Sequence, residues 1–338
     1  MPEGPEVRCV VDELNSFLPN SCSILNFHAF SNKIVGLENL ILPLRFEKIL
    51  CRGKQMFFIF TNGQCLMSHF NMSGAWLLSH DFSSTVDGKN NWLSLLIGRD
   101  SGSAISNNKY FSLPAIIPPL ESVGSQGSQG SQESQGSQGS QEGDPSAPSS
   151  GGPSTPSSGS PSTPSSGGPS APQHFHLNFM ASLFGSVKYE ADWVQAWYKL
   201  PPDLISGEVD EANFKMTALK HKGLTLTNLL LGNYWGGIGN YLRCEILYWA
   251  RLSGFRLVNS LSEEDLHRLY HTVMHVILDS YHNGGYSGGK YFGPFLQPGR
   301  YRVAVYKQKF DPYLNEVKYE KGVKGGPRPN HWVPSLQV

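Results

Sequence analysis

The chain has 338 residues, of which 39% are apolar, so it can fill the cores of two domains. Lys and Arg together number 27, as do Asp and Glu, and the resulting net charge of zero argues against a nucleic-acid partner. The balance hides a division, because residues 213–338 contain 16 Lys and Arg against 8 Asp and Glu, which gives them +8 and leaves −8 for residues 1–212. The final third is therefore basic, and an anionic partner is not excluded there.

The cysteines and histidines predict neither a metal site nor a cofactor. No CxxC pair is present, and we expect no histidine cluster at metal-ligand spacing, so zinc is not expected. Reduced thiols fit an intracellular protein best. No apolar run approaches the length of a membrane span, and the N-terminus lacks the regions of a signal peptide. We expect a soluble, intracellular protein without a membrane partner, in the nucleus if the source is eukaryotic.

The first predicted element is a helix over about residues 5–18. Apolar residues recur at helical spacing between Pro5, which suits a first turn, and Pro19, which ends the run. Aromatic and β-branched runs follow at residues 21–30, 44–60 and 64–70. Asn62-Gly63 separates the last two as a hairpin turn. This part of the chain is predicted to be a β-rich domain with an N-terminal helix.

A low-complexity segment at residues 122–172 is predicted to be a disordered insertion. It repeats GSQ and then PST and PSS, and it has too few apolar groups to offset the entropy of ordering it. Strand-like patterning resumes at HFHLNFMASLFGSVKY, so the insertion interrupts one domain and does not separate two. The N-terminal domain is therefore assigned to residues 1–121 and 173–200.

The pattern becomes helical after residue 200. GLTLTNLLLGNYWGGIGNYLRCEILYWARL indicates a helix, a glycine-rich turn and a second helix, and Ser262 with Asp265 forms a variant capping box that starts another. YRVAVYKQKF, NEVKYEKG and NHWVPSLQ then suggest a small basic β-hairpin unit. We assign residues 201–298 to a helical domain and residues 299–338 to a terminal finger.

The opening stretch MPEGPEV has two interpretations. Pro2 could simply precede and cap a helix. Alternatively, removal of Met1 would expose a secondary amine whose ordinary pKa lies near physiological pH, and the positive end of the following helix would favour its neutral form. Such an amine forms an iminium with an aldehyde carbon, while Glu3 or Glu6 could donate a proton. The second interpretation predicts covalent chemistry at a sugar carbon.

The stretch GGIGNYLRCE also has two interpretations. Glycine-rich turns between helices are common and need no function. Asn240, however, stands at the start of the next helix, where free backbone N–H groups and a basic domain would make a phosphate clamp.

These stretches together resemble the formamidopyrimidine-DNA glycosylase/endonuclease VIII family. The resemblance rests on MPEGPEV, RGK at 52–54, HFNMSG at 69–74, LPPDL at 200–204, GGIGNYLRCEILY at 236–248 and PRPNHWVPSLQ at 327–337. It implies an α+β fold with an N-terminal β-sandwich, a helix–two-turns–helix motif and a finger. It also implies a bifunctional DNA glycosylase and abasic-site lyase of base excision repair, which would act on damaged DNA, duplex or single-stranded, as a monomer.

The resemblance assigns roles to individual residues. Pro2 matches the nucleophile and Glu3 the acid that assists opening of the sugar. Lys54 matches a lysine that holds phosphate beside the lesion, and Arg328 a finger arginine that clamps phosphate and is linked to strand cleavage. Further positions match DNA contacts: Glu6 near the lesion, His69 and Met72 in the HFNMSG stretch, Phe184, and Asn240 as a phosphate ligand. Met72 would fill the gap left by a flipped base, although ordinary core packing is the alternative for it, as a solvated strand end is for Lys54.

The chain also departs from the family. Val333 and Leu336 occupy the positions of the last two of four zinc-binding cysteines, so the finger is expected to fold without metal. Ser182 stands where a second gap-filling arginine is usual. A non-catalytic damaged-DNA-binding protein remains an alternative, and an RNA-binding helix–turn–helix protein would explain GIGN but not MPEGPE.

Overall fold

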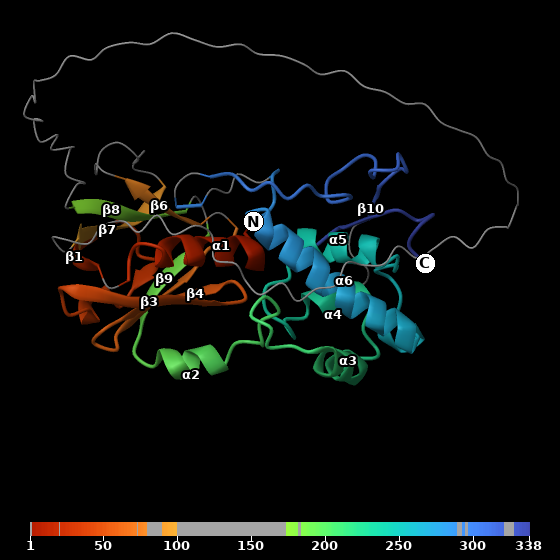
Figure 1. Cartoon of the computed structure of the whole chain (residues 1–338), viewed down its shortest axis with the longest axis horizontal. Coiled ribbons are helices and arrows are strands. Elements are labelled where there is room, and N and C mark those ends of the chain that lie inside the picture. Colours follow the sequence, from red (N-terminus) through yellow and green to blue (C-terminus); the bar gives the residue numbers. More distant parts are fainter. Residues whose placement is uncertain are drawn as a thin grey trace, which may run out of the picture. The chain divides into compact units, whose positions relative to one another are not determined.

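The computed structural model describes residues 2–19, 21–72, 74–79, 90–99, 174–181, 184–288, 293–294, 297–320 and 328–338. A nine-stranded sheet with helices α1 and α2 forms the N-terminal part, and a group of helices followed by a short two-stranded sheet forms the C-terminal part (Figure 1). The predicted α+β class with two domains is confirmed. The predicted disordered insertion at residues 122–172 lies outside the described residues.

Helix α1 (Gly4–Asn15) starts the chain with Pro5 in its first turn. Its apolar face is buried in the core of the β-domain, where Val7, Val10 and Leu14 are fully inaccessible to solvent. The side chain of Asn15 holds the far end of the helix on β3 (Leu44–Arg52), donating to the carbonyl of Ile49 at 2.7 Å and accepting its N–H at 2.9 Å. These contacts fix the direction of α1, and so the place of its first residues.

The nine strands form one sheet whose two halves share a core. Its order is β2-β9-β5-β4-β3-β1-β7-β8-β6, and β1 and β3 pair at only two positions. Phe58 of one half meets Trp76 of the other at 5.0 Å between ring centroids, and Trp76 meets Phe179 at 5.1 Å. The predicted β-sandwich is therefore a single sheet folded over a common interior. Besides β3, the strands are β1 (Cys22–Ala29), β2 (Ile34–Val35), β4 (Gln55–Phe60), β5 (Cys65–His69), β6 (Ala75–Ser79), β7 (Asn91–Arg99), β8 (His174–Met180) and β9 (Ser186–Glu190).

One connection of the sheet was predicted correctly, and a second one bears on the predicted insertion. β4 and β5 form an antiparallel hairpin across the Asn62-Gly63 turn, where Gly63 has a φ of +80°. β7 and β8 also pair antiparallel, although the long segment at residues 100–173 lies between them. The strands on either side of it belong to one sheet, which agrees with the prediction that the insertion at residues 122–172 interrupts one domain.

The helical domain is built around α5 (Asn240–Trp249), in which every residue from 240 to 248 is buried. Because α5 is enclosed on all sides, other elements must cover it, and residues of α4, α6 and the finger pack against it. The predicted succession of helix, glycine-rich turn and helix corresponds to α4 (Leu226–Leu231) followed by α5. The helical domain also contains α3 (Glu211–Lys220), α6 (Glu263–His282) and the 3-10 turn η2 (Val258–Ser260). The short helix α2 (Trp193–Tyr198) and the 3-10 turn η1 (Leu37–Asn39) instead pack on the β-domain.

The finger differs from its prediction in one segment. β10 (Lys318–Glu320) and β11 (Asn330–Trp332) pair antiparallel, but residues 301–310 form no strand. The buried carboxylate of Glu245 explains this difference, because it accepts the backbone N–H groups of residues 304, 305 and 306 at 2.6, 3.0 and 2.9 Å. These donors are no longer available to a strand ladder. Val305 and Val333 are both buried against Cys244 of α5, so the finger packs through apolar contacts.

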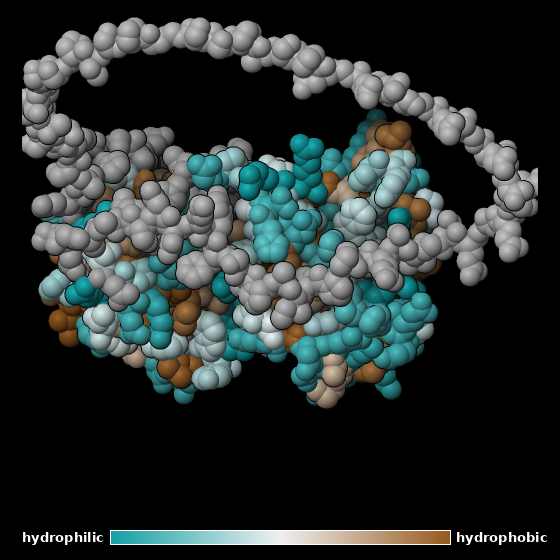
Figure 2. All heavy atoms as spheres, viewed as in Figure 1, coloured by the Kyte–Doolittle hydropathy of each residue, from teal (hydrophilic) through white to brown (hydrophobic). Residues whose placement is uncertain are grey.

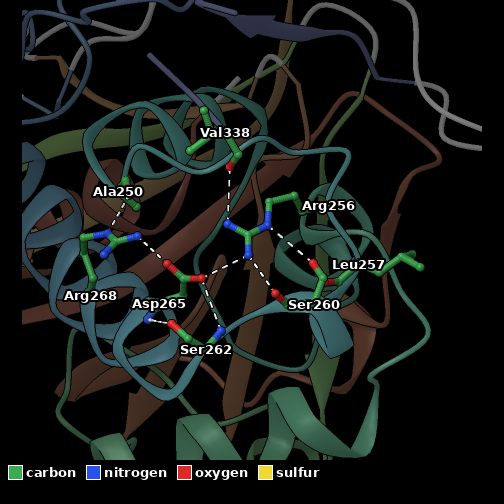
Figure 3. Close-up of polar contacts among 8 residues, drawn as sticks. All are labelled: Ala250, Arg256, Leu257, Ser260, Ser262, Asp265, Arg268 and Val338. Atoms are coloured by element: carbon green, nitrogen blue, oxygen red, sulfur yellow. Dashed lines mark hydrogen bonds and ion pairs between the residues drawn. The ribbon is translucent and has the colours of Figure 1, made fainter. Parts of the chain in front are cut away.

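A network around Asp265 fixes the start of α6 (Figure 3). Asp265 and Ser262 form the predicted capping box, with Asp265 N–H donating to Ser262 Oγ at 3.0 Å and Ser262 N–H to Asp265 Oδ2 at 3.2 Å. The guanidinium groups of Arg256 and Arg268 approach the same carboxylate from two sides. Burial alone would raise the pKa of Asp265, but the Ser262 N–H and the two guanidinium groups outweigh it and lower that pKa.

Replacing Asp265 with Asn should destabilise the protein by about 1–3 kcal/mol at neutral pH, because two charge-assisted hydrogen bonds are lost. Since the folded-state pKa of Asp265 is lowered, its contribution is present above the ordinary value of 3.8 and is lost as pH falls through the folded pKa. Urea denaturation at several pH values measures this, with Glu264→Gln in the same first turn as the control. A difference that does not shrink in acid would contradict the assignment.

Candidate active site

A cleft of about 480 Å³ opens between the β-domain and the helical domain. Its walls include the turn between β3 and β4 on one side and the glycine-rich loop before α5 on the other. Five of the lining side chains carry cationic nitrogens or an imidazole, which suits an anionic ligand. These five are Arg52, Lys54, His69, Arg243 and Arg328.

Lys54 joins the two walls of the cleft. It follows Gly53, whose φ of +59° turns β3 sharply into β4, and its Nζ donates to the carbonyl of Ile238 at 2.7 Å. Burial lowers the pKa of Lys54, the charge of Glu3 opposes this change and the charge of Arg328 adds to it. The alternative of a solvated charge at a strand end is therefore wrong, because this lysine is largely buried at the domain boundary.

Glu3 links the first residues of α1 to the start of α5. Its side chain is 1% exposed and accepts the backbone N–H groups of Tyr241 at 3.1 Å and Leu242 at 3.3 Å. We expected these N–H groups to be free for a phosphate, and this expectation was wrong. A carboxylate from the same chain already satisfies the helix N-terminus, which favours negative charge.

Burial raises the pKa of Glu3 from 4.5 to about 7. The charge of Lys54 and the two backbone donors of α5 lower it, whereas the charge of Glu6 raises it further. A carboxyl group with a pKa near neutrality can both give and take a proton at physiological pH, as general acid–base catalysis requires.

Glycine is needed where α1 meets the loop before α5. A Cβ on Gly239 would lie 2.2 Å from the Glu3 carboxyl carbon, and one on Gly4 would lie 2.7 Å from the Cα of Gly237. The N–H of Gly4 also donates to the carbonyl of Gly237 at 2.9 Å. The GGIG sequence therefore allows the two backbones to approach closely enough for Glu3 to reach α5.

The side chain of Glu6 is buried and makes hydrogen bonds that stabilise the fold. Its carboxylate accepts the hydroxyl of Tyr241 at 2.7 Å, the N–H of Tyr286 at 2.8 Å and the N–H of Glu3 at 2.8 Å, and the residue is 2% exposed. These bonds hold α1 against the helical domain and orient Glu3. Contact of Glu6 with a nucleotide stays a prediction.

His69 and Met72 lie at the end of β5 and in the turn that follows. His69 lines the cleft, and its Nδ1 accepts the N–H of Asn71 at 2.9 Å, so the neutral ring carries its hydrogen on Nε2 as a donor. Burial, with the charge of Lys54, lowers the pKa of His69. Met72 is 62% exposed, so ordinary core packing does not account for it.

The remaining predicted site residues differ in their burial and contacts. Pro2 is buried directly before Glu3. Asn240 is 9% exposed, does not line the cleft, and has an Oδ1 that finds no partner in the described part of the chain. Phe184 is half exposed and its ring lies 5.9 Å from the ammonium of Lys33. Ser182 lies outside the described residues.

Arg243 was missed by the sequence analysis. It is fully buried in α5 and lines the cleft together with Arg328, and its Nη2 donates to the carbonyl of Pro329 at 2.6 Å. Its Nε and Nη1 have no hydrogen-bond partner among the described residues. The available signal was the one basic residue in a helix rich in apolar and aromatic residues. Because buried guanidinium nitrogens are costly to leave unpaired, Arg243 is suited to an anion in the cleft.

Comparisons with known proteins agree with this arrangement. The sequence model of the formamidopyrimidine-DNA glycosylase N-terminal domain matches residues 1–103. The formamidopyrimidine-DNA glycosylase of Thermus thermophilus is 33% identical over 161 residues, which are 46% of this chain and 60% of that protein. Endonuclease 8 of Klebsiella pneumoniae is 36% identical over 78 residues, which are 23% of this chain and 30% of that protein. This chain is therefore similar to the formamidopyrimidine-DNA glycosylase/endonuclease VIII family, most clearly over residues 1–103.

The fold is also that of solved members of the family. The Lactococcus lactis formamidopyrimidine-DNA glycosylase in complex with abasic-site DNA has a TM-score of 0.68 and 18% identity, and 99% of each chain is covered. A mutant of the same enzyme with Fapy-dG-containing DNA has a TM-score of 0.69 and 19% identity, again with 99% of each chain covered. The sequence matches to the two curated relatives span less than two thirds of their lengths. Within the described segments, no helix has both the length and the apolar character to cross a membrane.

Replacing Glu3 with Gln should stabilise the folded protein more at about pH 8 than at about pH 4. The folded pKa of Glu3, about 7, exceeds the ordinary 4.5, so the stabilisation that the neutral Glu3 carboxyl gives is fully present below pH 4.5 and is lost as pH rises through 7. This loss is about 3 kcal/mol. The Gln variant does not titrate and does not suffer it. Thermal denaturation at both pH values measures it, with exposed Glu38→Gln as the control. Equal effects of Glu3→Gln at both pH values would show that this carboxyl ionises normally.

Proposed function

We propose that this chain is a bifunctional DNA glycosylase and abasic-site lyase of base excision repair that removes oxidised bases. The observation that carries the proposal is the buried Glu3, with a pKa of about 7, held directly after Pro2 and beside a cleft lined by cationic side chains. The similarity to this family supports the same activity. The related Lactococcus lactis enzyme has been solved with abasic-site DNA and with DNA containing an oxidised pyrimidine.

In the proposed reaction, removal of Met1 frees the amine of Pro2. Its nitrogen attacks the anomeric carbon of a flipped nucleotide, and the bond from that carbon to the base breaks. Glu3 gives a proton to the sugar ring oxygen as the ring opens, which leaves a Schiff base between Pro2 and the sugar. Loss of a proton from the neighbouring carbon then expels the 3′ phosphate, and a second elimination releases the 5′ phosphate.

The cleft would hold the DNA backbone near the lesion. Lys54 and Arg328 are the proposed phosphate ligands, His69 offers its Nε2 hydrogen, and buried Arg243 has two nitrogens without partners in the described structure. The exposed Met72 would enter the gap left by the flipped base. We propose duplex or single-stranded damaged DNA as the partner of a monomer, with Glu6, Phe184 and Asn240 in supporting contacts.

The proposed finger folds without zinc. Val333 and Leu336, at the positions where the last two ligand cysteines of many relatives are expected, pack in the same apolar cluster as Val305 and Tyr248. The carboxylate of Glu245 holds the backbone before the hairpin. These contacts supply the fixed geometry that a metal would otherwise provide.

Borohydride should trap the protein covalently on DNA that contains an abasic site, through Pro2. Mass spectrometry of the purified protein should show that Met1 is absent, and peptide mapping should place the adduct on Pro2.

Replacing Glu3 with Gln should reduce base excision by roughly 10²-fold or more, because the proton donor is lost, and should reduce cleavage of a pre-formed abasic site less. A panel of oligonucleotides with oxidised bases measures the first step.

Two outcomes would contradict the proposal. Full trapping after the N-terminus has been chemically blocked would exclude the Pro2 amine. Tight binding to abasic-site DNA with neither trapping nor nicking would instead identify a damaged-DNA-binding protein without turnover.

Replacing Arg328 with Ala should weaken DNA binding and reduce the salt slope of log K by about 0.7–0.9, the value of one phosphate contact. Arg328 is exposed, so the melting temperature should barely change. Arg302→Ala removes another exposed arginine that does not line the cleft and serves as the control. Fluorescence anisotropy across a salt titration measures the slopes. If Arg328→Ala and Arg302→Ala give the same slope, Arg328 makes no phosphate contact.

A further inference from the structure

A second cluster of polar side chains lies on α3 and α6, outside the cleft. Glu211 is the first residue of α3, and His267 and His271 are one turn apart on α6. Glu211 Oε1 lies 2.7 Å from Nδ1 of His267, and Oε2 lies 3.3 Å from Nε2 of His271. The expectation that no histidine cluster stands at metal-ligand spacing was therefore wrong: His267 and His271 are four residues apart on one helix, and the placement of α3 beside α6 adds Glu211 to them.

Packing below the cluster sets its geometry. Phe214, one turn after Glu211, is fully buried and its ring lies 5.5 Å from that of Tyr270, which stands directly before His271. The hydroxyl of Tyr270 donates to the carbonyl of Val209 at 3.2 Å, at the approach to α3. Asp210 caps α3 by accepting the N–H of Asn213 at 2.7 Å. The backbone positions of the three polar residues are thus fixed from beneath.

The three side chains supply the donor atoms that zinc prefers. One ligand atom from each residue lies within 4.8 Å of the other two. Atoms bound to a tetrahedral zinc ion lie about 2.0–2.2 Å from it and therefore roughly 3.3 Å from one another, so only small side-chain movements are needed. Two imidazoles and one carboxylate favour zinc over magnesium or calcium, which prefer oxygen ligands. We propose that Glu211, His267 and His271 bind a zinc ion.

The surroundings of the cluster make the site open to solvent. The side chains of His267 and His271 are 56% and 47% exposed, and the surface over α3 and α6 is mainly hydrophilic (Figure 2). Three protein ligands leave one tetrahedral position for water. Because the ligands come from two helices, the ion would connect α3 to α6 and stabilise the helical domain.

Lys215 competes with the ion. Its Nζ lies 2.7 Å from Oε1 of Glu211 and also contacts Glu263. Lys215, followed by His267, holds the pKa of Glu211 at about 2, so no proton needs to leave the carboxylate when metal binds. The ammonium nevertheless repels a divalent cation, whereas Oε2 faces His271. Removal of this positive charge should therefore strengthen zinc binding. If the three residues form only a hydrogen-bonded cluster that does not bind metal, removal of the charge would not produce zinc binding.

Calorimetric titration of the full chain with zinc chloride tests the proposal. We expect one saturable site that is absent in the His267→Ala/His271→Ala double variant, weakened roughly tenfold or more by His271→Ala, and strengthened by Lys215→Ala. Zinc should also raise the melting temperature of the wild type and not that of the double variant. The side chains of His267 and His271 are exposed, so their variants should fold.

His275→Ala is the matched control. His275 is exposed one turn beyond His271 on α6 and lies outside the cluster, so its removal should leave zinc binding unchanged. Titration of the control and the double variant separates this site from binding to cysteine thiols elsewhere. Wild-type binding retained by the double variant, or equal weakening by His275→Ala and His271→Ala, would overturn the proposal, as would the absence of saturable binding in the wild type.

Discussion

The structure depends on one interaction: the carboxylate of Glu3 accepts two backbone N–H groups at the start of α5. Each helix N-terminus presents unsatisfied donors and partial positive charge, and here a residue from the opposite domain satisfies them. The glycines of the loop before α5 exist in part to permit this approach, since a Cβ on Gly239 would collide with the carboxyl group. The first residues of α1, the loop and the cleft are consequently parts of one assembly.

This interaction stabilises the contact between the two domains and also keeps the pKa of Glu3 near neutrality. A carboxylate that is 1% exposed would be costly if it were unpaired, yet the two N–H groups and the charge of Lys54 do not fully offset burial, and the pKa stays near 7. A better-solvated Glu3 would stabilise the fold at neutral pH and would be a poorer proton donor. Such compromises concentrate at functional sites.

Helix α5 carries this organisation through the second domain. Its first turn receives Glu3, the buried Arg243 extends to the carbonyl beside Arg328, and Glu245 holds the backbone that leads into the finger. Three charged side chains, two of them on α5, therefore connect the β-domain, the helical domain and the finger. Because each of these three side chains is buried, replacing one of them should alter the geometry of the cleft that lies among them.

The sequence by itself determined the local elements and the residue types at the site. Helical periodicity placed α1, α4, α5 and α6, the Ser262 capping box placed the start of α6, and Asn62-Gly63 placed a hairpin, since these signals act over a few residues. MPEGPEV and GGIGN were recognised as two separate features. Only the tertiary structure brought Glu3 to the α5 N–H groups, removed the expected strand at residues 301–310 by giving its donors to Glu245, revealed the unpaired nitrogens of Arg243, and placed Glu211 beside His267 and His271. Each of these joins groups far apart in the chain, and periodicity and spacing carry no information about such contacts.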